Sequence, residues 1–304
     1  MSSSSSPSPS PSASAALAAA SIRHSRPRTA RALAARSVLY ALLIAIAVVY
    51  IMPFLIQIAT SFKTEADAAA NPVSLIPGTW TTAAYSRLFL SSDFPIWLRN
   101  SFVVTLFVTA GRAFFDSLAG YALARLHFRG RQVITAAVIA VMSVPSVVLL
   151  IPKFLVIKQL AIYDTYAGMI LPLLVDAAGV FIMKNFFESI PASVEEQARV
   201  DGAGTFRIFW SIVLPMARPS LVTIIIMSFQ GSWNELSHFI VSTQSPQLTT
   251  LTKGVASLAS GQLSSGTQYP LKLAAALIMT IPVAVLFFIF QRRIMNTSEG
   301  AVKQ

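Results

Sequence analysis

Residues 188–219 read ESIPASVEEQARVDGAGTFRIFWSIVLPMARP and form the most informative polar stretch of the chain. Ser193 and Glu196 have the spacing of a capping box, in which a hydroxyl and a carboxylate close free amides at a helix start. Pro191 keeps this helix from extending backwards, and Gly202 is able to adopt the left-handed conformation that ends one. The stretch therefore predicts a short capped helix of about two turns.

The same stretch predicts a surface ion pair and a second helical segment. Glu195 and Arg199 are four residues apart, in the favourable order for a pair on a helix surface. An amphipathic segment that we expect along the membrane interface follows, with Phe206, Phe209, Trp210 and Val213. The residues alone leave two interpretations open: an ordered connecting loop, or a rigid knob that passes force from a soluble partner to the flanking helices.

The composition places the chain in a membrane. Hydrophobic residues make up 55% of the 304 residues and charged residues 12%, whereas a soluble domain carries about 25% charged residues. An ordinary soluble enzyme is therefore excluded. The chain has no cysteine, which excludes disulfides and thiolate sites, and its three histidines are too scattered to predict a metal site. We expect no catalytic residues and no cofactor.

Six apolar segments, each long enough to cross a bilayer as a helix, follow one another along the chain. They lie at about 38–58, 100–124, 133–157, 166–185, 217–240 and 272–292. Prolines 145, 152, 172 and 282 lie in or near these segments, where we expect them to kink the helices rather than end them. The predicted fold is all-α, with six transmembrane helices.

The basic residues predict the orientation. The net charge is +11, and 15 of the 23 Lys and Arg residues fall on the side of the predicted membrane that holds both termini. Seven fall on the opposite side, and Arg112 lies inside the second segment. By the positive-inside rule both termini are cytoplasmic, so the positive charge reflects topology and no nucleic-acid partner is expected.

Three regions follow from these patterns. Residues 1–36 are a cytoplasmic tail, rich in Ser, Pro and Ala and then basic, whose first part is predicted to be disordered. Residues 37–293 form the membrane domain, including the polar loop 188–216, and residues 294–304 form a cytoplasmic C-terminal tail.

The polar loop resembles the cytoplasmic signature of permease subunits of binding-protein-dependent ABC importers. That signature runs Glu-Ala-Ala, three residues, Gly, nine residues, Ile, one residue, Leu-Pro. Here Glu196-Gln197-Ala198 precedes Gly202, and Ile212 precedes Leu214-Pro215 at the same spacings. Gln197 is the one departure. Further short matches resemble the carbohydrate-uptake branch, in particular the second, six-helix permease of maltose-type systems: Ser61–Thr64, Asn100-Ser101, Tyr121–Arg125, Ile190-Pro191, Val200–Ala203, Trp233-Asn234 and Gly300–Lys303.

This resemblance implies a fold, partners and a coupling site. The fold is the type I permease fold of ABC importers, with a coupling helix at 193–203 between helices 4 and 5. The implied partners, besides membrane lipid, are a second related permease, two ATP-binding subunits, a sugar substrate, and an extracytoplasmic solute-binding protein that docks on the outer loops around 61–97 and 241–270. The contact with the ATPase falls on Glu196, Ala198, Asp201 and Gly202.

Charged and aromatic residues near the membrane are candidates for a substrate path. Arg112 and Asp116 are four residues apart and either pair with each other or line the path, and Asp176 has no obvious local partner. Trp233 is either an interface anchor or a sugar-lining residue, and Asn234 is the first choice for a substrate contact.

One alternative is a self-contained secondary transporter or channel. Such proteins often contain inverted repeats, and no internal duplication is visible in the sequence. The chain also lacks the phosphate-binding loop G-x-x-x-x-G-K, so an importer of this kind requires separate ATPase subunits.

Overall fold

The computed structural model describes residues 30–260 and 268–300, and side chains for 36–260 and 268–291. The predicted disorder at the N-terminus lies outside these residues. Within them, all regular secondary structure is helical. The chain divides into two compact units, residues 1–54 and 55–304. The first contains, in its described part, helix α2 (Ala30–Ser61) up to Phe54.

Four helical segments are long and apolar enough to cross a membrane without a sharp bend. They are residues Arg36–Ser61 of α2, Phe94–Arg125 (α5), Tyr166–Ser189, and Tyr269–Gln291 of α16. The membrane domain was expected to span residues 37–293. Helix α2 begins before this range, at Ala30, and helix α16 runs from Tyr269 to Gly300 and so continues beyond it.

Two further spans are bent helix pairs. Helix α6 (Arg131–Met142) meets η1 (Ser146–Leu149) and α7 (Leu150–Gln159) at 105°. The segment Thr205–Met216, made of α11 (Thr205–Ile208), the π-helix η3 (Phe209–Val213) and α12 (Leu214–Met216), meets α13 (Arg218–Trp233) at 81°. With each pair counted as one span, the described residues contain six, which confirms the predicted fold class.

The expectation that prolines only kink the spans is wrong at Pro145. This residue has extended backbone angles and separates α6 from η1, because proline has no N–H to continue the helical hydrogen bonds. Pro172 lies in η2 (Leu171–Leu173), which directly continues α8 (Tyr166–Ile170) inside the span Tyr166–Ser189, and the non-helical residues 174–176 separate η2 from α9 (Ala177–Ser189). Pro282 does lie inside a continuous helix. The apolar segment 217–240 is also not one helix, because α13 ends at Trp233 and α14 spans Ser237–Ser242.

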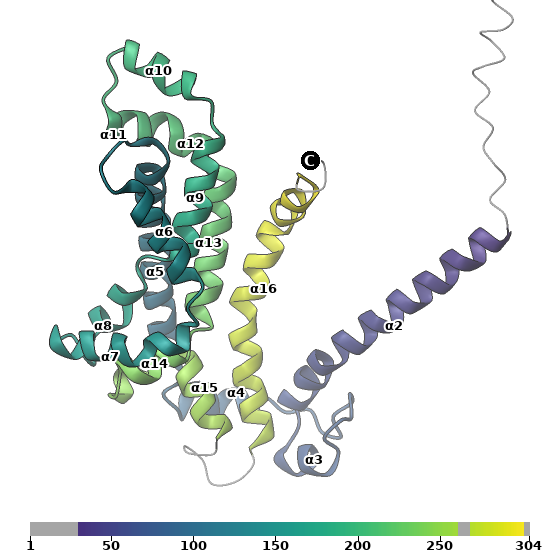
Figure 1. Ribbon diagram of the computed structural model, residues 1–304. Helices are drawn as coiled ribbons and strands as arrows, with labels where there is room; N and C mark the ends of the chain where they lie inside the picture. The colour runs from purple at the N-terminus through teal and green to yellow at the C-terminus, as the bar shows by residue number, and fades with distance from the viewer. Residues whose placement is uncertain (1–29, 261–267, 301–304) are drawn as a thin grey trace, which may run out of the picture. The chain divides into compact units, whose positions relative to one another are not determined.

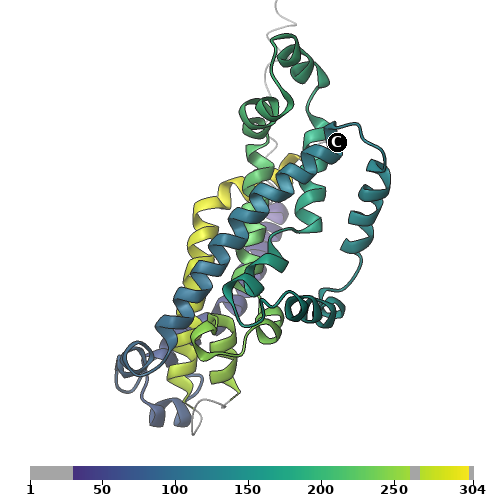
Figure 2. The same ribbon diagram turned by 90° about the vertical axis from the view of Figure 1, so that its left-hand side faces the viewer.

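Helices α5, α9 and α13 pack side by side in the second unit (Figure 1). At one end of this bundle stands the small helix α10 (Ala192–Val200), and the opposite end holds short helices (Figure 2). The short helices are α3 (Glu65–Ala70), α4 (Ala83–Leu90), α14, η4 (Pro246–Leu248) and α15 (Leu251–Ala259).

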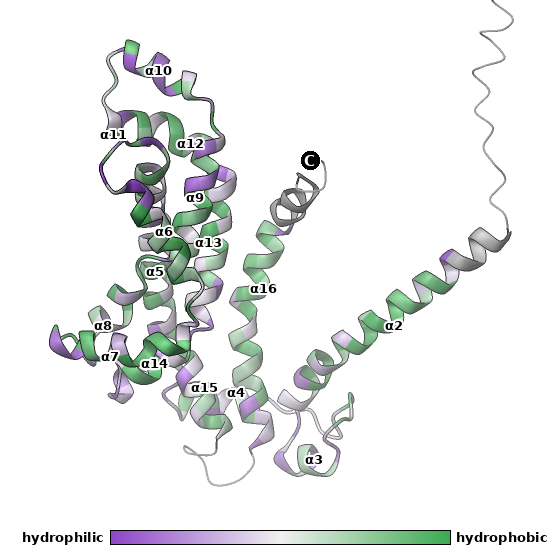
Figure 3. Cartoon of the chain, viewed as in Figure 1, coloured by the Kyte–Doolittle hydropathy of each residue, from purple (hydrophilic) through white to green (hydrophobic). Residues whose placement is uncertain are grey.

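The buried core is divided between the two ends of the bundle. Near α10 it includes Tyr121, Phe187, Ala198 and Phe209, and near α15 it includes Trp97, Trp233 and Leu251. Large apolar side chains remain exposed along much of α2, α5, α6 and α16, whereas polar residues gather on α10 (Figure 3). Exposed apolar surface of this extent is typical of helices in lipid.

Candidate functional site

Helix α10 ends in a Schellman motif centred on Gly202. The Gly202 N–H donates to the Arg199 carbonyl at 3.0 Å, and the Ala203 N–H donates to the Ala198 carbonyl at 2.9 Å. Gly202 has φ +80°, the left-handed conformation that this motif requires. The predicted stop of the helix at this glycine is therefore confirmed, and it fixes the direction in which the chain leaves α10.

The predicted capping box is wrong. The N-cap of α10 is Pro191, without a side-chain capping bond, and Ser193 is already helical. The helix begins earlier than the spacing indicated, because the fixed φ of proline suits a helix start and its missing N–H is not needed there.

A buried ion pair holds α10 against the membrane helices. Glu195 is only 4% exposed, and its carboxylate lies 3.1 Å from Nε of Arg125 at the end of α5. The Tyr121 hydroxyl donates to the same carboxylate at 3.2 Å. The predicted pair with Arg199 is present at 3.7 Å, but it is the outer contact of this cluster.

Arg125 also binds the C-terminal end of α9, the membrane helix that precedes α10. Its guanidinium donates to the Phe187 carbonyl at 2.6 Å and to the Ile190 carbonyl. One side chain of α5 thus joins the C-terminus of α9 to the start of α10. The sequence contains no signal for these contacts beyond the short match at Tyr121–Arg125, because the partners are 62 and 65 residues away from Arg125.

The four expected coupling residues divide into two sets. Glu196, Asp201 and Gly202 are exposed and form an accessible surface at the tip of α10. Ala198 is 7% exposed and packs into the core beneath the helix, so it supports that surface without being part of it. Val200, which the sequence did not single out, is 87% exposed on the same helix.

The segment after α10 is amphipathic as predicted. Phe209 and Val213 are buried in the core, whereas Phe206 and Trp210 are exposed and stack with an interplanar angle of 9°. Two exposed aromatic rings beside a membrane bundle suit the lipid interface.

The predicted pairing of Arg112 with Asp116 is wrong. Arg112 forms no ion pair among the residues whose side chains are described, and its Nε donates to the Leu173 carbonyl at 2.7 Å. Asp116 is fully buried and accepts the Asp176 N–H at 3.0 Å. The two α5 side chains bind opposite sides of the non-helical turn before α9, whose free backbone groups attract them.

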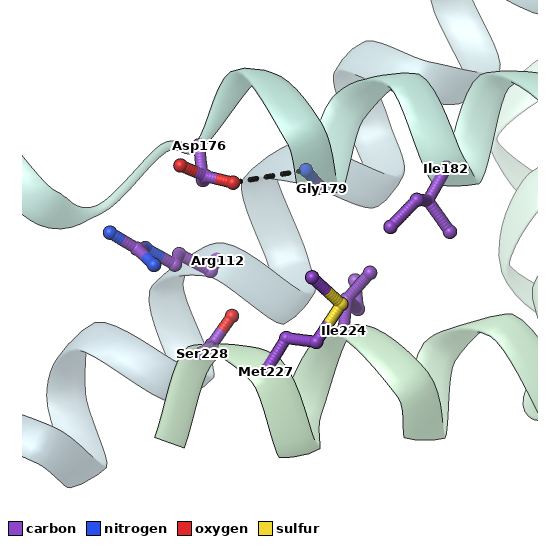
Figure 4. A pocket seen from close by; sticks show the side chains of 7 residues that line it. All are labelled: Arg112, Asp176, Gly179, Ile182, Ile224, Met227 and Ser228. Atoms are coloured by element: carbon purple, nitrogen blue, oxygen red, sulfur yellow. Dashed lines mark hydrogen bonds between the residues drawn. The ribbon is translucent and has the colours of Figure 1, made fainter. Parts of the chain in front are cut away.

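Arg112 and Asp176 line a small, partly open cavity of about 70 Å³ between α5, α9 and α13 (Figure 4). One Asp176 oxygen caps α9 by accepting the Gly179 N–H at 3.2 Å. The remaining lining consists of the Ser228 side chain and apolar residues, namely Ile182, Ile224 and Met227, with Gly179. The structure thus places Asp176, one of the expected pathway residues, at a cavity between the candidate membrane spans.

Asn234 lines a second, larger and more polar cavity of about 260 Å³, at the break between α13 and α14. Lys153, Glu235 and His238 lie around the same cavity. Trp233 does not line it: this side chain is 1% exposed, and its Nε1 donates to the Met279 carbonyl at 3.0 Å. The Trp233 ring is buried in the core. It therefore fits neither of its two interpretations, the interface anchor or the sugar-lining residue.

The expected outer docking loop is held in place by Asp164. Its carboxylate accepts the backbone N–H groups of Gln244 and Ser245 at 2.9 and 3.0 Å, and also the Ser245 hydroxyl. These hydrogen bonds lower the pKa of Asp164 from its ordinary value, and the bond from the Ser245 hydroxyl has the largest effect. Lys253 fixes the same loop by donating to the Thr243 carbonyl at 2.6 Å.

Comparison with known proteins decides the family. The profile described as "Binding-protein-dependent transport system inner membrane component" matches residues 116–296, more than half of the chain. The chain belongs to this family. It is a multi-pass inner-membrane permease component of an ABC transporter, and in this family the ATPase is a separate subunit. Membership also decides against the self-contained secondary transporter that the sequence left open.

Permeases of several transport systems are similar over most of their length. The sulfoquinovosyl glycerol transport system permease protein of Agrobacterium fabrum is 34% identical, over 78% of this chain and 83% of the relative. The diacetylchitobiose uptake system permease protein of Streptomyces coelicolor is 30% identical, over 87% and 88%. The crystal structure of a bacterial ABC transporter involved in the import of the acidic polysaccharide alginate contains a chain with a TM-score of 0.77 and 26% identity. That match covers 88% of this chain and 99% of the other.

Proposed function

We propose that this permease imports sugars or oligosaccharides and that α10 is its coupling helix. The similar permeases named above serve a sugar glycoside, a disaccharide and a polysaccharide, which supports a carbohydrate substrate. The observation that carries the coupling role is the geometry of α10. Its exposed tip stands at one end of the bundle, and its buried face is tied through Arg125 to α5 and α9.

The proposed assembly has four further protein components. A second, related permease completes the pathway, two ATP-binding subunits dock on Glu196, Asp201 and Gly202, and an extracytoplasmic binding protein docks near 61–97 and 241–270. Both termini and α10 face the cytoplasm. Closure of the ATPase dimer then moves α10, and the helices tied to it change the access of the pathway from one side of the membrane to the other. Asp176 and Asn234 are the proposed pathway residues.

Gly202→Trp tests the coupling role. A large side chain at the exposed tip obstructs docking of the ATPase, and its β-carbon is unfavourable at positive φ. We expect the subunits to reach the membrane while solute-stimulated ATPase activity and uptake both fall at least tenfold. Wild-type rates of both activities would refute the role.

Gly130→Trp is the matched control. Gly130 also has positive φ, at +89°, also has open space around its Cβ position, and lies in the other predicted cytoplasmic loop, between α5 and α6. It therefore reproduces the strain and the bulk without touching α10, and we expect it to retain coupled transport. Co-purification of the wild-type chain with an ATPase and a second permease tests the assembly itself.

A further inference from the structure

Helix α13 contributes to both cavities. Ile224 and Ser228 line the inner cavity, and Gly231 lines the outer one together with Glu235, which lies just beyond the end of α13. Ile224, Ser228 and Gly231 are spaced four and three residues apart, the spacing of a single helix face. The two cavities therefore follow one another along the same side of α13.

Arg112 reaches from the inner cavity toward the outer one. It lines the inner cavity, and its Nη1 lies 3.8 Å from the point where a β-carbon on Gly231, in the outer cavity, would stand. The glycine leaves that space open. The Arg112 Nε is bonded to Leu173, and no hydrogen bond or ion pair to the described residues engages its two Nη groups. A cation with free donors at membrane depth is costly unless it faces water or a polar ligand.

Hydrogen-bonding groups of both kinds surround this point. Figure 4 shows Arg112, Asp176 and the Ser228 hydroxyl directed toward the inner cavity from three different helices or their ends. Asp176 uses one oxygen to cap α9 and keeps the other for a ligand. The outer cavity adds Lys153, Asn234 and Glu235. In the lining of the two cavities, Arg112 and Lys153 are balanced by two carboxyl groups, those of Asp176 and Glu235.

We propose that this subunit contributes its own solute-binding passage along α13, in which Arg112 binds the oxygen atoms of an uncharged, polyhydroxylated solute. Sugar hydroxyls are able to accept from Arg112 and donate to Asp176 together, while Ile182, Ile224 and Met227 cover the apolar face of a sugar ring. The cations and carboxyl groups of the lining balance, which favours a solute without net charge. This inference rests on the proposed carbohydrate import and adds the binding residues and the charge class of the solute.

Cysteine accessibility tests the passage. The chain has no native cysteine, so Ser228→Cys and Asn234→Cys each introduce one thiol. Its reaction in the assembled transporter is measured as the mass added to this subunit. We expect both thiols to react with a membrane-impermeant thiosulfonate, in the nucleotide-free or the ATP-trapped state. The control Leu106→Cys, on an exposed apolar position of α5, stays unreacted. The passage would be overturned if Ser228→Cys did not react in either state while the transporter still hydrolysed ATP and imported its solute. That result would not contradict the proposed importer function.

The charge class is tested at the same thiol. We compare the reaction rates of two thiosulfonate reagents with Ser228→Cys, one carrying a cationic trimethylammonium group and the other an anionic sulfonate group. Both rates are measured with and without the second substitution Asp176→Asn. The expected result is a cationic reagent at least as fast as the anionic one, and a shift toward the anionic reagent in Asp176→Asn. An anionic reagent that is tenfold faster in the parent would show a site for anions and overturn the proposed class.

Gly231 gives a test by obstruction. Gly231→Ala fits, because its methyl group lies at ordinary contact distance from Arg112, whereas Gly231→Leu fills the space between Arg112 and the outer cavity. We expect uptake to survive in the first variant and to fall at least tenfold in the second, with both still co-purifying with the ATPase. Equal uptake by the two variants in assembled complexes would overturn the passage.

Discussion

At the scale of single residues, the contact of Glu195 with Arg125 has the largest mechanical consequence. The sequence predicted only a surface role for Glu195, because local spacing reveals partners on the same helix and nothing beyond it. The structure buries this carboxylate between α5 and α10, with Arg125 and Tyr121 as its inner partners. Burial and long-range partners are tertiary properties, so one sequence could not supply them. Gly202 was predictable, because its left-handed conformation is a local requirement.

Removing one member of this pair should loosen α10. Glu195→Ala leaves the Arg125 guanidinium buried with only its carbonyl partners, and breaking such a pair costs about 3–5 kcal/mol. We expect the amides of Ala192–Val200 to exchange hydrogen at least tenfold faster in the assembled transporter, and transport per ATP hydrolysed to fall. Gln197→Ala, at another exposed position of α10, is the control and should change the local free energy of opening by less than about 0.5 kcal/mol. The same exchange rates in both variants would contradict the anchoring role of Glu195.

At the scale of the helices, the spans were predictable but their breaks were not. Hydropathy and length placed all six, since the bilayer sets both quantities. The interruption between η2 and α9 depends on Asp116 and Arg112 of another helix, which satisfy the backbone groups that the break leaves free. The sequence indicated that these charges belong together, yet it could not show that each binds backbone instead of the other.

Gly179 tests how tightly this break is built. A β-carbon at Gly179 would overlap the buried Asp116 carboxylate, so Gly179→Ala has to displace this carboxylate, which accepts the Asp176 N–H. Such overpacking costs about 1–3 kcal/mol. We expect a lower Tm for the purified transporter, whereas Gly231→Ala, which has room for its methyl group, should leave the Tm unchanged or raise it slightly. A Gly179→Ala transporter as stable as the Gly231→Ala one would show that Asp116 does not hold the break rigidly.

At the scale of the whole molecule, the distribution of charge connects topology to coupling. With six spans in the described residues, α10 and the loop between α5 and α6 lie on one side of the membrane, and the segments 62–93 and 234–260 lie on the other. The excess of Lys and Arg predicts that the first side is cytoplasmic, where ATP is available to a partner on α10. The opposite orientation would place α10 on the side without ATP, away from any ATPase. The proposed coupling role of α10 therefore requires the predicted orientation.

Single cysteines on the two sides test this orientation. Ser193 on α10 and Ser91 between α4 and α5 are both exposed, and the native chain has no cysteine that would compete. In sealed right-side-out vesicles, a membrane-impermeant maleimide should label Ser91→Cys and leave Ser193→Cys unlabelled until the membrane is opened with detergent. In inside-out vesicles the order should reverse. Labelling of Ser193→Cys from outside in sealed right-side-out vesicles would refute the cytoplasmic position of α10, and the proposed coupling to the ATPase with it.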